Sequence, residues 1–470
     1  MLENAIIGSG IGGSLIASLQ DKTSTILFEQ DKNLGGCAST FKRFGKKFNT
    51  GATTFVGYEQ DHIVQELFQK TNTQPNIKKS DIAIRVIQDS KTTDRVKNFE
   101  QFLEQLHKNY PHKNHTLFWE KLKKIDEKFW QLEKIYFGKY ELKRYIKTSY
   151  FILELLSTFG LELFKSAESF IKEHYPNIDK EYKDFLDAQL LITVQTTAQN
   201  ISLLSLALGL SYPFHDVFYA NGGMGELIKE ITKNIEVHTQ EKITKIIPHK
   251  DHYELFSTKD RYEAKNVILN SSIYDSYKLF EDSKIQEYYN SFSFSDQSAF
   301  VVYLYIQSKE KFLHHYQIIL DDFLPNCISK SFFVSFSDQE DSAFNKNNGY
   351  SITISTHTQA NYWEDLPSEL YSIEKERTQA FIVQKFLEYF DTIDPQQIIE
   401  SFSATSITFN RYIGRHNCGG KAINFKNVME LPSCQTPFKG LYNVGDTVFA
   451  GQGWPGVAIG VDVLNKELHG

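Results

Sequence analysis

This sequence has few cysteines, no apolar run long enough to span a bilayer and no excess of positive charge. Its four cysteines, Cys37, Cys327, Cys418 and Cys434, lie far apart and form no CxxC pair. This spacing argues against a disulfide framework or a metal site and favours a reducing, cytoplasmic location. The formal net charge is −7 and there is no lysine-rich arm, so nothing in the composition indicates nucleic-acid binding.

The longest apolar run covers residues 150–164 and contains Glu154 and Glu162, so it is too short and too charged to span a bilayer. Basic residues flank this run, namely Lys139, Lys143, Arg144, Lys147, Lys165 and Lys172. A basic, aromatic-rich amphipathic helix can lie on a membrane surface, wall an internal cavity or pack in a core. The pattern leaves all three readings open.

Glycine-rich turns, in contrast, stand near both ends of the chain. Residues 2–7 have the pattern of a short buried strand, and Gly8, Gly10 and Gly13 then form GxGxxG before a helix. Gly8 permits the tight turn, Gly10 lets the backbone approach a pyrophosphate, and Gly13 lets the helix pack close to the strand. The N-terminus of that helix directs N–H groups at the phosphates. This context predicts a dinucleotide site.

The next strand, residues 24–29, ends in Glu29. A carboxylate there accepts hydrogen bonds from ribose hydroxyls and repels a 2′-phosphate. Gly35 and Gly36 follow, and Gly51 comes after a further short strand. Such a continuation suits an extended dinucleotide whose flavin end is surrounded by backbone, so FAD is favoured over NAD.

The second glycine-rich turn reads GDTVFAGQGWPGVAIG and follows a strand that begins near residue 440. Asp446 is placed to accept a hydrogen bond from a ribityl hydroxyl. Pro455 suits the first turn of the helix that follows. The positive end of that helix would face the N1–C2=O edge of the flavin, where negative charge gathers on reduction. We therefore interpret this turn as the flavin-end counterpart of the first.

Between the turns, residues 60–215 have a helical pattern. Phe118, Leu122, Ile125, Phe129, Leu132 and Tyr136 recur at alternating spacings of four and three residues. This stripe predicts one amphipathic helix face packed in a core.

Strand patterns dominate the second half of the chain. A meander is predicted over 243–249, 252–257 and 261–264, and a separate buried strand over 266–270 returns to the nucleotide sheet. Strands over 298–307, 331–336 and 350–356 precede a helix over 368–391.

Together these patterns predict an α/β fold with a discontinuous Rossmann-type FAD-binding domain, an α+β substrate domain with a mixed sheet, and a helical insert. The FAD-binding domain comprises residues 1–60, 216–285 and 436–470. The insert covers 61–215, where it faces a membrane or lines a substrate tunnel. The substrate domain covers 286–435.

Several stretches together carry a resemblance to a known family. The set GSGIGG, GGCASTF, GGMGEL, TSITFNRYIGR and GLYNVGDTVFAGQGWPGVAIG resembles the phytoene desaturase and carotenoid isomerase group of flavoproteins, whose architecture is like that of the amine oxidases. The likeness covers essentially the whole chain and is nearest to the carotenoid 3′,4′-desaturase branch. Cys37 stands where many phytoene desaturases have Arg, which disfavours that activity, and it is similar to the Cys of retinol saturases.

The resemblance implies non-covalent FAD, an apolar polyene substrate drawn from the membrane, and a tunnel that ends at the flavin. It implies a peripheral position on the inner face of the cytoplasmic membrane. The electron acceptor, oxygen or a quinone, stays open. The oligomeric state stays open. The cofactor contacts carried over are Gly8, Ser9, Gly10, Ile11, Gly12, Gly13, Glu29, Gln30, Gly36, Cys37, Ala38, Ile243, Gly445, Asp446, Trp454, Gly456 and Val457.

Desaturation beside a conjugated chain removes a hydride to flavin N5 and a proton elsewhere. Because the polyene delocalises the developing cation, the protein needs little beyond positioning and a modest base. The absence of a Ser-His-Asp or paired-acid pattern therefore does not count against catalysis. The catalytic candidates are Trp454, which would shape the tunnel end, and Arg411, Arg415 and His416.

Desaturation is the first expectation for the activity. The alternatives are an FAD-dependent polyene cis-trans isomerase, a retinol-saturase-like reductase, an amine-oxidase-like enzyme on a small substrate, and a flavoprotein without enzymatic activity.

Overall fold

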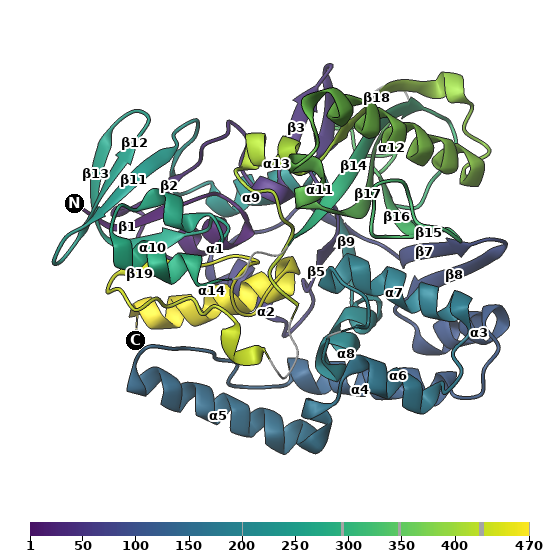
Figure 1. The fold of residues 1–470 in the computed structure, drawn as a ribbon, viewed down its shortest axis with the longest axis horizontal. Helices are drawn as coiled ribbons and strands as arrows, with labels where there is room; N and C mark the ends of the chain where they lie inside the picture. The colour runs from purple at the N-terminus through teal and green to yellow at the C-terminus, as the bar shows by residue number, and fades with distance from the viewer. Residues whose placement is uncertain (200, 293–295, 346–348, 423–426, 470) are drawn as a thin grey trace.

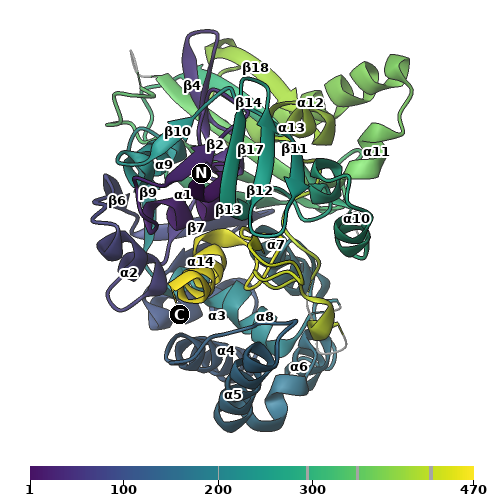
Figure 2. The same ribbon diagram turned by 90° about the vertical axis from the view of Figure 1, so that its left-hand side faces the viewer.

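The computed structural model of the chain describes residues 1–470 except residues 200, 293–295, 346–348, 423–426 and 470. Two seven-stranded sheets form the upper part of the molecule in Figure 1, and helices α4, α5 and α6 lie below them. Figure 2 shows the same arrangement from the side of the first sheet.

The first sheet, which we call the nucleotide sheet, has the strand order β10-β2-β1-β13-β12-β11, with β19 paired to β13. Its strands are β1 (Leu2–Ile7), β2 (Thr25–Phe28), β10 (Glu236–His238), β11 (Ile243–Pro248), β12 (Tyr253–Ser257), β13 (Arg261–Leu269) and β19 (Leu441–Asn443). Helices α1 (Ile11–Ser18), α9 (Met224–Thr232) and α14 (Gly453–His469) pack together beside it. Three distant parts of the chain thus build one sheet.

Strand β13 differs from the prediction of two separate strands over 261–264 and 266–270. Its first half pairs antiparallel with β12, and its second half pairs parallel with both β1 and β19. The burial pattern changes from alternating to continuous at Val267, where the strand enters the middle of the sheet. One strand therefore joins the meander to the parallel sheet without an intervening turn.

The second sheet, the substrate sheet, has the order β18-β14-β17-β16-β15-β7-β8. Its strands are β7 (Ile82–Gln88), β8 (Lys91–Val96), β14 (Gln297–Gln307), β15 (His315–Ile319), β16 (Ser331–Phe336), β17 (Gly349–Gln359) and β18 (Ile398–Ala404). Helix α12 (Ser368–Tyr389) contributes Ile382 and Phe386 to the apolar core on one face of this sheet. The predicted strands near 298–307, 331–336 and 350–356 are confirmed, whereas β15 and β18 were not predicted.

The region 61–215 is less purely helical than its sequence pattern predicts. Strands β7 and β8 lie within it and complete the substrate sheet, because β7 pairs parallel with β15. Its helices are α2 (Ile63–Lys70), α3 (Phe99–Asn109), α4 (His115–Trp130), α5 (Leu142–Phe159), α6 (Ala167–His174), α7 (Lys180–Val194) and α8 (Leu203–Ser211). A short strand β6 (Ile77–Lys79) pairs with β9 (Val217–Ala220), which also pairs with β5 (Phe55–Val56).

The predicted aromatic stripe is a core face, but its helix is shorter than predicted. Phe118, Leu122 and Phe129 are buried on α4, which ends at Trp130. Tyr136 lies beyond the helix, and its hydroxyl donates to Glu467 at 2.6 Å. Among the helices that the structure describes, none combines the length and apolarity needed to cross a bilayer.

Candidate functional site

A cavity of about 920 Å³ extends from the nucleotide sheet to the helical region. Its volume lies in the range of ligand-binding sites. Both glycine-rich turns line it, as do residues of α4, α7 and α8. Every predicted cofactor contact lines this cavity except Gly13, which lies behind its wall.

The first turn brings helix α1 as close to β1 as a backbone allows. Gly8 has a φ of +100°, which favours glycine. A Cβ on Gly13 would lie 2.0 Å from the Gly8 carbonyl oxygen, and a Cβ on Gly10 would lie 2.7 Å from Asn270 Nδ2. The start of α1 therefore faces the cavity with bare backbone, as close approach of a pyrophosphate requires.

Glu29 stands at the cavity edge just beyond β2, held by the first turn. One carboxylate oxygen accepts from the Ser9 N–H at 3.0 Å and from the Ser9 hydroxyl at 2.6 Å. The other accepts from the Asp31 N–H at 2.9 Å. Gln30 and Ile243 line the cavity nearby. This part of the cavity suits the adenosine end of a dinucleotide.

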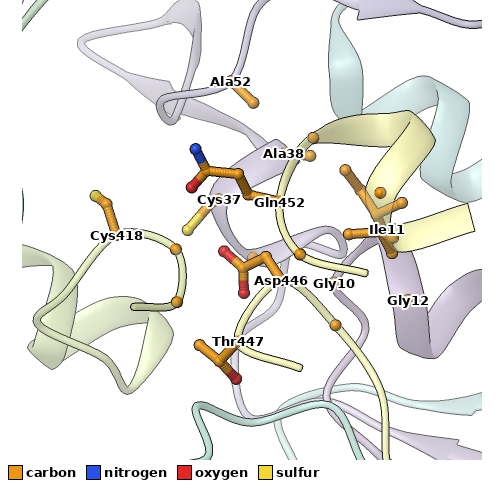
Figure 3. Close-up of a pocket in the computed structure, with 18 of the residues that line it drawn as sticks. Gly10, Ile11, Gly12, Cys37, Ala38, Ala52, Cys418, Asp446, Thr447 and Gln452 are labelled. Atoms are coloured by element: carbon orange, nitrogen blue, oxygen red, sulfur yellow. The ribbon is translucent and has the colours of Figure 1, made fainter. Parts of the chain in front are cut away.

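The second turn meets the first directly. A Cβ on Gly12 would lie 3.0 Å from the Gly445 nitrogen, so the two turns touch through glycine. Asp446 then projects into the cavity near Gly10 (Figure 3). Its two carboxylate oxygens accept from Arg415 Nη1 at 2.9 and 3.1 Å.

Arg415 places a positive charge beside Asp446 at the end of the cavity where the two glycine turns meet. Burial opposes its charge, but Asp446 outweighs that effect and raises the pKa of the guanidinium above its usual value. Its Nε donates to the Asn417 carbonyl at 2.8 Å. Its buried Nη2 has no hydrogen-bond partner in the described part of the chain. Arg415 therefore keeps a donor available at the cavity.

Two cysteines line the same end. Cys37 lies beside Asp446, and Cys418 lies on the loop that faces them (Figure 3). Burial raises the pKa of the Cys37 thiol and raises that of Cys418 to about 12, so both thiols stay protonated at neutral pH. Cys434, predicted as a core residue, is buried in the main apolar core.

Trp454 opens the first turn of α14 and lines the cavity next to Gly456 and Val457. Its ring meets Phe55 edge-on at 4.8 Å between centroids, and the side chain is buried. Its Nε1 has no hydrogen-bond partner among the described residues. A buried donor of this kind is normally satisfied, so a ligand acceptor is expected opposite it.

The other predicted candidates occupy different positions. Arg411 is exposed on α13 (Ser406–Ile413) at the cavity edge. His416 does not line the cavity and instead pairs with Glu364 at 2.8 Å and Asp275 at 3.6 Å. The structure therefore brings Arg415 and Trp454 together with the glycine turns, but not His416.

A cluster of charged side chains at the helical end of the cavity was not predicted from the sequence. His215 Nε2 lies 2.6 Å from Asp126 Oδ2 on α4, and His215 Nδ1 bonds Glu59. Burial opposes the charge of His215, but the two carboxylates outweigh it and raise its pKa to about 9. Burial likewise opposes ionisation of Glu59, but His215 and Lys97 lower its pKa to about 2.

His62 stands beside this cluster in the opposite charge state. Its ring lies 4.4 Å from that of Trp130, and both line the cavity. Burial and the charge of His215 lower the pKa of His62 to about 4, so it is neutral at pH 7.

A second missed group lines the middle of the cavity. His357 Nε2 lies 3.0 Å from Gln195 Oε1, and Gln452 Nε2 donates to the Thr193 carbonyl at 2.7 Å. Burial lowers the pKa of His357 to about 4, so this imidazole is neutral as well. No sequence spacing marked His357 as a cavity residue.

The described residues fit FAD. The glycine cradle would receive the pyrophosphate, Glu29 the ribose, Asp446 the ribityl chain, and the start of α14 the flavin edge. The unpartnered donors of Arg415 and Trp454 match a ligand rich in acceptors. Within the described parts of the chain, no group of three His, Cys, Asp or Glu side chains is placed to hold a metal ion.

Comparison with known proteins gives a consistent picture. Residues 17–401 match the family described as flavin containing amine oxidoreductase. The chain is 22% identical to the chloroplastic prolycopene isomerase of Arabidopsis thaliana over 96% of this chain and 80% of that protein. The structure of an oxidoreductase from Methanosarcina mazei has a TM-score of 0.63 at 16% identity and covers 99% of this chain and all of its own. The CLA-producing fatty acid isomerase from P. acnes has a TM-score of 0.60 at 12% identity, covering 99% and 98% of the two chains.

Proposed function

Because this chain belongs to the family of flavin-containing amine oxidoreductases and takes FAD as its cofactor, we propose that it acts on an apolar polyene of the carotenoid class. The family and its structural relatives confirm the predicted α/β FAD-binding fold. The likeness to prolycopene isomerase confirms the predicted resemblance to the carotenoid isomerase group. Both the polyene substrate and the reaction that it undergoes belong to the proposal.

The observation that carries the proposal is the continuity of the cavity. Beyond the two glycine turns it continues along apolar and aromatic side chains of the helical region, including Phe129, Ile201 and Leu208. An extended apolar chain fits such a lining, since its burial is favoured and few polar groups need partners.

Bound FAD would supply a hydride acceptor, and the chain's residues would do the rest. The N-terminus of α14 would stabilise negative charge on the flavin edge, and Trp454 would exclude water beside it. The neutral imidazoles of His357 and His62 line the cavity and can accept a proton in the transition state. Desaturation needs such an acceptor, and it is our first candidate reaction.

Isomerisation is the second candidate, and a specific observation favours it. A relative that matches across 96% of this chain is named as a prolycopene isomerase. A redox-neutral isomerisation needs no net electron acceptor, whereas a desaturase must pass electrons to oxygen or a quinone. A retinol-saturase-like reduction would run the hydride transfer in the opposite direction.

The deciding experiment expresses the protein in cells that accumulate known acyclic carotenoids and records absorption spectra of the extracted pigments. A red shift supports desaturation, a blue shift supports saturation, and a changed cis band at a nearly constant maximum supports isomerisation. Unchanged pigments in cells whose protein carries FAD would reject a carotenoid substrate. Reduction of the bound flavin by putrescine or cyclohexylamine would instead support an amine oxidase.

A further inference from the structure

The side chain of Asn270 lies between the two glycine-rich turns. Asn270 directly follows β13, which pairs with both β1 and β19, and these two strands lead into the two turns. Its backbone N–H donates to the Ile7 carbonyl at 2.9 Å. The carbonyl of the preceding residue, Leu269, accepts from the Val444 N–H at 2.9 Å. The main chain therefore fixes Asn270 at the point where both turns begin.

The nitrogen of the Asn270 carboxamide contacts the first turn. Nδ2 donates to the Gly8 carbonyl at 3.1 Å. A Cβ on Gly10 would lie 2.7 Å from Nδ2, and the three atoms nearest to that Cβ would all belong to Asn270. Gly10 has an ordinary φ of −58°, which any residue adopts. Close packing against the carboxamide, rather than backbone strain, therefore requires a glycine at this position.

The oxygen of the same carboxamide lies where the two turns meet. Oδ1 would be 2.8 Å from a Cβ on Gly12 and 2.8 Å from a Cβ on Gly445. Gly12 belongs to the first turn and Gly445 to the second. A side chain at either glycine would displace the carboxamide, so one planar group packs against both turns.

An amide suits this position better than a carboxylate of the same shape. A carboxamide has a donor for the Gly8 carbonyl and an uncharged oxygen for the space between Gly12 and Gly445. A carboxylate would have no donor for Gly8 and would place a negative charge near the start of α1, where the pyrophosphate is expected. Asn270 also lines the cavity, so its charge state would be felt by the ligand.

A dinucleotide that extends along the cavity must contact both turns at once. The second contact of such a ligand adds affinity only when the two binding sites have the right relative position. The first turn receives the pyrophosphate, and the second receives the ribityl chain and the flavin edge. The position of one turn relative to the other therefore decides how tightly FAD is held.

We propose that Asn270 is a positioning residue whose carboxamide holds the two glycine-rich turns in the relative position that lets FAD contact both. Removal of the carboxamide leaves a gap beside Gly12 and Gly445, into which the second turn can move. This role concerns the cofactor and is independent of the substrate and reaction proposed above.

The test compares two ligands of different reach. ADP carries adenosine and pyrophosphate and reaches the first turn alone, whereas FAD extends to the second. The full-length protein is stripped of flavin, and calorimetry gives the dissociation constants of ADP and FAD for the wild type and Asn270→Ala. Asn266→Ala is the matched control, because Asn266 Nδ2 donates to Asn4 Oδ1 at 3.1 Å between the same strands, β13 and β1, away from the cavity.

We expect Asn270→Ala to weaken FAD binding about 100-fold and ADP binding less than about 3-fold, because only FAD needs the second turn in place. Asn266→Ala should leave both dissociation constants unchanged. Equal weakening of both ligands by Asn270→Ala would mean that Asn270 supports the first turn only. Unchanged FAD affinity would mean that the turns keep their positions without it. Either result overturns the proposal.

A second variant keeps the test decisive if Asn270→Ala folds poorly. Asn270→Asp preserves the shape of the side chain but loses the donor to Gly8 and adds a negative charge beside the pyrophosphate. We expect it to weaken FAD and ADP alike, each at least about 10-fold. Full FAD affinity in Asn270→Asp would overturn the placement of this side chain against the ligand. Since no polyene enters these measurements, they stand or fall separately from the proposed function.

Discussion

The wall of the cavity is mostly backbone at one end and mostly side chains at the other. At the cofactor end the wall is mostly glycine backbone, supplied by two turns that touch at Gly12 and Gly445. At the helical end it consists of side chains, among them Asp126 and His215, whose charges hold three separate segments together. Backbone dictates one shape at any pH, whereas an ion pair holds only while its groups are charged. The first end suits an invariant cofactor and the second can vary with the substrate.

The largest expected loss of stability and of FAD binding comes from adding a side chain at Gly13, where α1 contacts β1. Gly13→Ala would place a Cβ 2.0 Å from the Gly8 carbonyl oxygen, so α1 must move away from β1. We expect a loss of about 3 kcal/mol in the free energy of unfolding and at least a roughly 10-fold loss of bound FAD. Flavin absorbance per protein and chemical denaturation measure both. Gly45→Ala, in a turn with a φ of +73° but open space around it, is the control for backbone strain without a close contact. A Gly13→Ala protein with full FAD would refute the contact argument.

The helical end should instead respond to pH. The pKa of His215 is raised to about 9 from an ordinary value of 6.5, so its stabilising contribution is complete below pH 6.5 and is lost as the pH rises through 9. We expect the stability difference between wild type and His215→Gln to shrink by up to about 3 kcal/mol over that interval. Denaturation at a series of pH values measures it. A pH-independent difference would mean that the bonds to Asp126 and Glu59 do not depend on the charge.

Asp446 is a side-chain element within the glycine-built end, so it tests the comparison directly. Asp446→Ala would remove the carboxylate that accepts from the Arg415 guanidinium. We expect a loss of about 2 kcal/mol in the free energy of unfolding and weaker FAD binding. The double variant with Arg415→Met should recover part of the stability but not the FAD affinity. If it recovers both, Asp446 serves only to neutralise Arg415.

The smallest effect is expected where a glycine is needed for its conformation alone. Gly451 has a φ of +109°, but a Cβ there would meet nothing within 4 Å. Gly451→Ala should therefore lower the free energy of unfolding by about 1 kcal/mol through backbone strain and leave the FAD content near the wild-type level. A loss as large as that of Gly13→Ala would show that the second turn, like the first, is shaped by close contact.

This contrast also explains how far the sequence could predict the molecule. The β1 turn, Glu29 and the start of α14 were predictable because each is a local pattern in which a few neighbouring residues set the backbone. The helical end was not, because His62, Asp126 and His215 come from separate segments that only the tertiary fold brings together. Strand β8 escaped prediction because it carries few apolar residues, and the mostly apolar β7 lies in a region whose wider pattern is helical.

The division of β13 into two strands was wrong for a related reason. A strand that changes partners along its length also changes its burial pattern, and a change of pattern resembles a boundary. Local periodicity reports the environment of a residue rather than the continuity of the backbone.

The contact between Gly12 and Gly445 also bears on how the protein is made. At translation rates of about 5–20 residues per second, the first turn leaves the ribosome long before β19 and α14 have been synthesised. Until then β13 has an unpaired edge in the nucleotide sheet, where β19 will later lie. During synthesis, therefore, only the half of the cofactor site that contains the first turn is present. FAD can contact both turns only after the last strand has joined the sheet.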